Sequence, residues 1–179
     1  MKRLSLLLLD ANVVIYLFEL GIWDRVLSFC DIHLARTVFD EAQFYEDDQG
    51  GKHPFDLSSY VDNKAIAAFD VLPSQMQAFF EQFDPVYLEK LDAGEAESLA
   101  YLLTASDEML ICSADKIVFR VLGNIDRSTQ GISLEEVLQK IGHGRRLRAC
   151  FGKAYRDTWT AKGVEERLRG FGTKAAKGR

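Results

Sequence analysis

Two aspartates each stand just beyond a short apolar run of residues. Asp10 ends the run at residues 4–9, and Asp115 follows the run at residues 109–112 after Ser113 and Ala114. Runs of this length are too short to cross a membrane and suit strands that are buried on both faces of a parallel sheet. Ligands of open α/β sheets bind just outside the carboxyl ends of the strands. A carboxylate at that position is either a cation ligand or the N-cap of the next helix, and both alternatives are open for Asp10 and Asp115.

Further carboxylates are expected at the same edge of the sheet. Glu41 lies in the first turn of a helix predicted directly after a strand, and Asp92 and Glu95 begin the helix predicted at residues 91–103. Asp92 and Glu95 also have the spacing of a capping box, which is the structural alternative for this pair. Clustered carboxylates raise one another's pKa unless a cation is present. Because no His or Cys joins the group, it favours Mg²⁺ or Mn²⁺ over zinc.

Strand and helix patterns alternate along the chain. Residues 11–20 and 22–29 predict helices, residues 32–38 predict a strand, and residues 39–45 predict a helix that follows at once. This order favours βαβ units and therefore an α/β fold with a parallel sheet. Residues 65–72 fit a third strand or a short helix equally well.

The middle of the chain interrupts this pattern. Residues 46–62 are polar and rich in glycine, which indicates a loop or an inserted hairpin. A helix is predicted at residues 75–83, and the pair Ser133 and Glu136 forms a second capping box before another helix.

Charge is distributed unevenly along the 179 residues. Residues 141–179 hold 11 of the 22 basic residues but only three of the 27 acidic ones. A basic end on an acidic body suggests a polyanionic partner, although a solvated helix would explain it as well. The first apolar run is too short for a signal peptide or a membrane span, so we expect a cytoplasmic protein without a membrane partner. Three widely spaced cysteines suggest neither a disulfide framework nor a zinc site.

Five segments of the chain together resemble one family. They are LLLLDANVVI, TVFDEAQF, LDAGEAESLAYLL, LICSADKIVFRVL and GISLEEVL, in that order. This order resembles the PIN-domain proteins, and within them the branch with a D-x-G-E-A-E helix that includes toxin ribonucleases of the VapC sort. The resemblance covers roughly residues 4–142 and is carried by the order of the segments more than by any one of them.

The resemblance implies a fold, an activity and partners. It implies a three-layer PIN-like α/β fold, in which helices cover both faces of a central parallel sheet, at residues 1–142. Residues 46–83 would then be an insertion or lid, and residues 143–179 a basic C-terminal helix and tail. The implied activity is that of an endoribonuclease that depends on Mg²⁺ or Mn²⁺ and hydrolyses RNA phosphodiesters. RNA, an antitoxin protein and a second copy of the chain are the implied partners.

The resemblance also assigns roles to individual residues. Three acids, Asp92, Glu95 and Glu97, lie in the segment that matches the third acid; Glu95 is favoured and Asp92 comes second. The predicted catalytic residues are Asp10, Glu41, Glu95 and Asp115; the predicted metal ligands are Asp10, Glu95, Asp115 and Asp92; and the predicted substrate contacts are Asn12 and Ser113. Arg145, Arg146 and Arg148 of the basic tail lie outside the resemblance and are predicted as further substrate contacts, because basic side chains hold RNA phosphates.

Two further expectations can be set against a structure. An Asp10→Asn substitution, which keeps the shape and removes the charge, is predicted to abolish cleavage without unfolding the protein. The aromatic residues Phe151, Tyr155 and Trp159 recur at helical spacing and favour packing over base stacking. The competing function is a PIN-like module that binds RNA or a protein without cleaving it.

Overall fold

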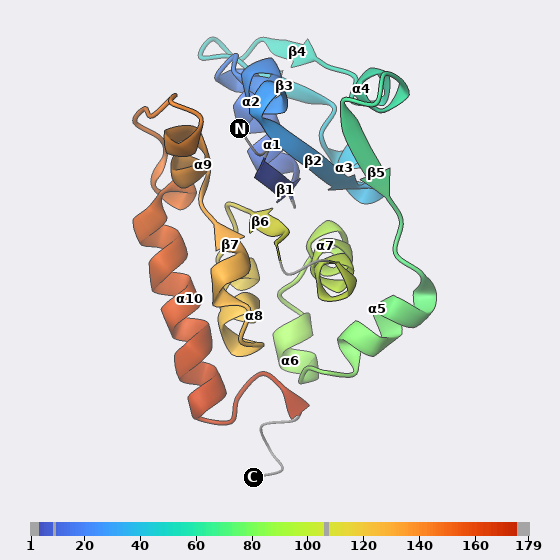
Figure 1. Ribbon diagram of the computed structural model, residues 1–179, viewed down its shortest axis with the longest axis vertical. Helices are drawn as coiled ribbons and strands as arrows, with labels where there is room; N and C mark the ends of the chain where they lie inside the picture. Colours follow the sequence, from blue (N-terminus) through green and yellow to red (C-terminus); the bar gives the residue numbers. More distant parts are fainter. Residues whose placement is uncertain (1–3, 9, 106–107, 175–179) are drawn as a thin grey trace.

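A parallel sheet forms the centre of the fold. The computed structural model describes residues 4–8, 10–105 and 108–174. Five strands lie side by side in the order β5 (Ile66–Phe69), β2 (Cys30–Ala35), β1 (Leu4–Leu8), β6 (Leu110–Cys112) and β7 (Gly131–Ile132), and each pairs with its neighbour in parallel (Figure 1). The expectation of an α/β fold with a parallel sheet is confirmed.

The first helices follow the predicted order but one boundary moves. α1 (Ala11–Glu19) and α2 (Trp23–Phe29) connect β1 to β2, as predicted. α3 (Arg36–Glu41) begins directly after β2, so the strand predicted through residue 38 and the helix predicted at 39–45 were wrong at this boundary. The pairing with β1 reaches Leu34 and the pairing with β5 reaches Ala35. Beyond Ala35, no strand in the described part of the chain offers hydrogen-bond partners to the backbone. The backbone of residues 36–41 therefore forms its hydrogen bonds within a helix.

Residues 44–69 contain a hairpin and an additional strand of the main sheet. β3 (Phe44–Glu46) and β4 (Lys52–Pro54) form an antiparallel hairpin, which is followed by α4 (Ser58–Asp62). Phe55 stacks on Phe18 of α1 with ring centroids 3.8 Å apart, so the hairpin is anchored to the body of the protein. A hairpin was one of the two alternatives for the polar segment at residues 46–62, and β5 shows that residues 66–69 form a strand of the main sheet; the role of residues 46–83 as an insertion or lid stays a prediction.

Helices connect the strands in the second half of the chain. α5 (Pro73–Phe80), α6 (Pro85–Leu88) and α7 (Ala93–Thr104) precede β6. α8 (Lys116–Asn124), the 3₁₀ turn η1 (Ser128–Gln130) and α9 (Leu134–Lys140) flank β7. Both predicted capping boxes are present, with Asp92 and Glu95 at the start of α7 and Ser133 and Glu136 at the start of α9.

The C-terminal helix is fixed to the body of the protein. α10 (Lys153–Leu168), which follows the 3₁₀ turn η2 (Ala149–Phe151), runs beside α8 (Figure 1). A Cβ on Gly163 would lie 2.0 Å from the backbone oxygen of Arg120, so only glycine permits this close approach of the two helices. Arg120 also pairs with Glu166 across the same contact.

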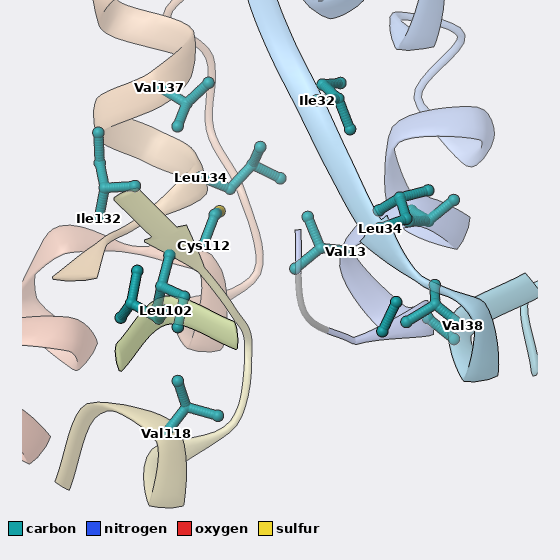
Figure 2. Packing of buried hydrophobic residues seen from close by; sticks show 14 of the residues in the cluster. Val13, Ile32, Leu34, Val38, Leu102, Cys112, Val118, Ile132, Leu134 and Val137 are labelled. Atoms are coloured by element: carbon teal, nitrogen blue, oxygen red, sulfur yellow. The ribbon is translucent and has the colours of Figure 1, made fainter. Parts of the chain in front are cut away.

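Buried side chains from distant parts of the chain fill one interior. Figure 2 shows residues from α1, β2 and α3 facing residues from β6, α8, β7 and α9. Phe151 of η2 joins this interior and stacks on Tyr16 of α1, which confirms a packing role for this member of the aromatic stripe. Among the described residues, no helix combines the length and apolar character needed to cross a bilayer.

Candidate active site

Asp10 ties the end of β1 to the loop after β6. Its Oδ1 accepts a hydrogen bond from the backbone N–H of Val13 (2.7 Å) and thereby caps α1. Its Oδ2 accepts hydrogen bonds from Ser113 Oγ (2.9 Å) and from the backbone N–H of Ala114 (3.0 Å). The loops meet because Leu8 and Cys112 are paired in the parallel register of β1 and β6. Asp10 is buried, and this burial raises its pKa against the opposing effect of these hydrogen bonds.

Ser113 joins the two aspartates. Its hydroxyl donates to Asp10 and accepts from the backbone N–H of Asp115 at 2.8 Å. Asp115 then caps α8 by accepting from the backbone N–H of Ile117 at 2.8 Å. Ser113 is fully buried, and its hydroxyl positions the two acids; its role as a substrate contact stays a prediction.

The acids at the start of α7 differ in their surroundings. Asp92 Oδ1 accepts from the backbone N–H of Glu95 (2.8 Å), and Glu95 Oε2 accepts from the backbone N–H of Asp92 (3.1 Å). Asp92 is exposed, whereas Glu95 is buried. Glu97 accepts a hydrogen bond from Thr37 of α3 instead (3.1 Å).

Electrostatic coupling singles out Glu95 among these acids. Burial, followed by the charges of Asp92 and Asp115 and more weakly by that of Asp10, raises the pKa of Glu95 to about 8. Glu95 therefore lies within electrostatic reach of both strand-end aspartates, which supports its choice as the third acid.

Glu41, the last residue of α3, belongs to the same group. It is exposed, and partial burial followed by the charges of Asp92 and Asp10 raises its pKa. The structure thus brings all the predicted catalytic acids to one edge of the sheet.

These acids have the donor chemistry of a hard-cation site. All of them offer carboxylate oxygens, and among the described residues no Lys or Arg is a leading cause of the pKa shifts of Asp10, Glu41 or Glu95. A divalent cation would lower the pKa values that the like charges raise. Within the part of the chain that the structure describes, however, no three His, Cys, Asp or Glu side chains are arranged as a ready metal-binding group. The donors fit a metal ion by type and charge, and binding one requires side chains to turn toward a common point.

Carboxylate oxygens remain available for such a change. One oxygen of Asp115 caps α8, and one oxygen of Glu95 forms part of the capping box at the start of α7. Within the described residues, the other oxygen of each side chain accepts no hydrogen bond. Helix capping and metal binding are therefore compatible for these two residues, because a carboxylate offers about four acceptor positions.

A cleft opens beside Asp115. It has a volume of about 260 Å³ and lies between α1, the loop after β6 and η2. Asn12 and Arg148, two of the predicted substrate contacts, line it together with Asp115. Arg145 and Arg146 are exposed outside the cleft.

Arg148 is held against α1 by several contacts. Its Nη2 lies 2.6 Å from Glu19 Oε1, and its guanidinium lies 4.7 Å from the centroid of the Tyr16 ring. The backbone N–H of Arg148 also donates to the Tyr16 hydroxyl at 3.3 Å.

The sequence interpretation missed Tyr16 and Glu19 as cleft residues. A signal was present, because Asn12, Tyr16 and Glu19 are spaced i, i+4 and i+7 and so share one face of α1. Nothing in the sequence, however, indicated that η2 would lie opposite this face.

The fold and the site define an α/β protein with a coupled acidic group at the carboxyl edge of a parallel sheet. No protein-family model, curated protein or solved structure matches the chain, so function is argued from the site.

Proposed function

We propose that the chain is a metal-dependent endoribonuclease with a PIN-like three-layer fold. The observation that carries the proposal is the convergence of Asp10, Glu95 and Asp115 from three separate segments at a single edge of the sheet, where the charge of Asp115 raises the pKa of both Asp10 and Glu95. Repulsion between these like charges brings no benefit to a purely structural protein, whereas a bound cation would compensate for it.

Asp10, Glu95, Asp115 and Asp92 would hold the metal ion, with Glu41 at the margin. A Mg²⁺ or Mn²⁺ ion in such a site activates a bound water and stabilises the charge of a phosphodiester transition state. Asp10 holds the loops after β1 and β6 together, and Asp115 presents its free oxygen beside the cleft. Asn12 and Arg148, which line the same cleft, are placed to bind the RNA strand.

Cleavage of labelled RNA by the Asp115→Asn variant tests this proposal. Asparagine caps a helix about as well as aspartate, so this variant keeps α8 and removes only the charge. We expect RNA cleavage in Mg²⁺ or Mn²⁺ by the wild type and a loss of at least about 100-fold in the variant, the scale on which one electrostatic catalytic group contributes. Asp126→Asn is the matched control, because Asp126 is exposed in the turn after α8 and pairs with Arg167. An unchanged rate in Asp115→Asn would show that the site is misassigned.

A non-catalytic PIN-like module is the second candidate. It is favoured by one observation: Asp10, Asp92 and Asp115 all cap helices, and the described residues contain no ready metal-binding group. RNA binding without metal binding or cleavage would support this function. An antitoxin and a second copy of the chain stay predictions of the resemblance.

A further inference from the structure

We propose that the cleft beside Asp115 binds one unpaired nucleobase of the RNA, with Arg148 as its stacking platform. The proposal rests on the proposed function, because it places this base next to the phosphodiester that the acids would cleave.

Flat groups form one wall of the cleft. The rings of Tyr16 and Phe151 are stacked with centroids 4.2 Å apart and an angle of 16° between their planes. The Arg148 guanidinium lies over the Tyr16 ring at 4.7 Å. The Phe151 ring and the Arg148 guanidinium therefore both lie against the Tyr16 ring.

The outer face of Arg148 is open to a ligand. The side chain of Arg148 is 61% exposed, although its guanidinium is fixed by Tyr16 on one side and by Glu19 at its edge. A guanidinium held in this way is a planar, positively charged surface of the kind on which unpaired RNA bases stack.

Polar groups around the cleft match the edge of a base. Asn12 offers an amide donor and an acceptor, while Glu19 and Asp115 offer acceptors. A nucleobase needs both kinds of group along its hydrogen-bonding edge. The volume of about 260 Å³ is below the range of roughly 300–1,000 Å³ typical for drug-sized ligands, which suits a single base. A base inside a duplex is already paired and stacked and could not enter.

The alternative is that Arg148 acts only as a charge that attracts phosphate. The two explanations differ in what a lysine at this position does. Lysine keeps the charge but lacks the planar guanidinium, so it preserves attraction for phosphate and loses the stacking platform.

The test is titration of the four 5′-ribonucleoside monophosphates into the full chain in EDTA, followed by NMR chemical-shift changes. We expect at least one nucleotide to perturb the signals of Asn12 and Tyr16. Arg148→Ala and Arg148→Lys should each weaken its binding by about tenfold, the size expected from losing one stacking partner. The matched control is Arg169→Ala, because Arg169 is an exposed arginine paired with Glu165 at the far end of α10, and it should bind as the wild type does.

Two results would overturn the inference. One is the absence of nucleotide binding at the cleft, and the other is wild-type binding by Arg148→Lys, which would show that charge alone is used. Because EDTA prevents metal-dependent cleavage, the outcome is independent of the nuclease proposal. Nucleotide binding by a protein that never cleaves RNA would refute the proposed nuclease function and support the cleft assignment. RNA cleavage without nucleotide binding at the cleft would support the nuclease function and refute the cleft assignment.

Discussion

Substituting the two strand-end aspartates by asparagine should destabilise the protein at Asp10 and leave its stability nearly unchanged at Asp115. Both oxygens of Asp10 accept hydrogen bonds from backbone N–H groups, of Val13 on one side and Ala114 on the other. Asparagine has only one oxygen, so its amide nitrogen must face one of these N–H donors in a buried position. These contacts therefore predict that Asp10→Asn lowers the stability of the folded state, while the expectation that the variant still folds stays a prediction.

The expected size of the effect follows from these contacts. Losing one hydrogen bond to a charged group costs about 1.5–3 kcal/mol, and a buried N–H is left without a partner. Asp115→Asn should change stability by no more than about 0.5 kcal/mol, because its single capping oxygen is retained at an exposed position.

Urea unfolding in EDTA measures this difference directly. The free energy of unfolding of each variant is obtained by linear extrapolation and compared with that of the wild type. Equal stability of the two variants, or a wild-type value for Asp10→Asn, would refute the hydrogen-bonding argument. For the same reason Asp115→Asn, and not Asp10→Asn, is the informative variant for activity.

Two further predictions concern packing and pH. Gly163→Ala should lower the free energy of unfolding by about 1–3 kcal/mol or more, because the new Cβ would meet the backbone of Arg120 at 2.0 Å; urea unfolding beside the control Gly144→Ala, whose Cβ would have ordinary contacts, checks this. A wild-type midpoint for Gly163→Ala would contradict the close helix contact. The pKa of Glu95 is about 8 in the folded state, against an ordinary value of 4.5. Between pH 4.5 and pH 8, Glu95 is therefore protonated in the folded state and ionised in the unfolded state. Without metal, stability should therefore fall as pH rises from about 4.5 to 8, by at most about 1.4 kcal/mol per pH unit, and Glu95→Gln should abolish this part of the slope; identical pH profiles would show that Glu95 is not so perturbed.

Local patterns predicted the acidic edge well. Asp10 and Asp115 were placed correctly because a short apolar run followed by a helix start depends on neighbouring residues alone. The box of Asp92 and Glu95 was equally readable, since both partners lie within one turn. The coupling between these segments then follows from the parallel arrangement of the strands.

Features that depend on distant contacts could not be predicted. The boundary between β2 and α3 is set by how far β1 and β5 extend, which no residue near Ala35 encodes. The cleft needs Arg148 to lie against Tyr16, 132 positions earlier in the chain. The burial of Ser113 and its hydrogen bond with Asp10, 103 positions earlier, are likewise a long-range contact that the sequence did not indicate.

The central claim is that the acids at the carboxyl edge of the sheet bind a divalent cation. Anomalous scattering from crystals soaked in millimolar Mn²⁺ tests it most directly. The account predicts a Mn²⁺ peak between Asp10, Glu95 and Asp115, with the second carboxylate oxygen of Glu95 directed toward the ion. No peak at this edge, with the three carboxylates still capping helices and bonding to the backbone, would contradict the claim and favour the non-catalytic binding module.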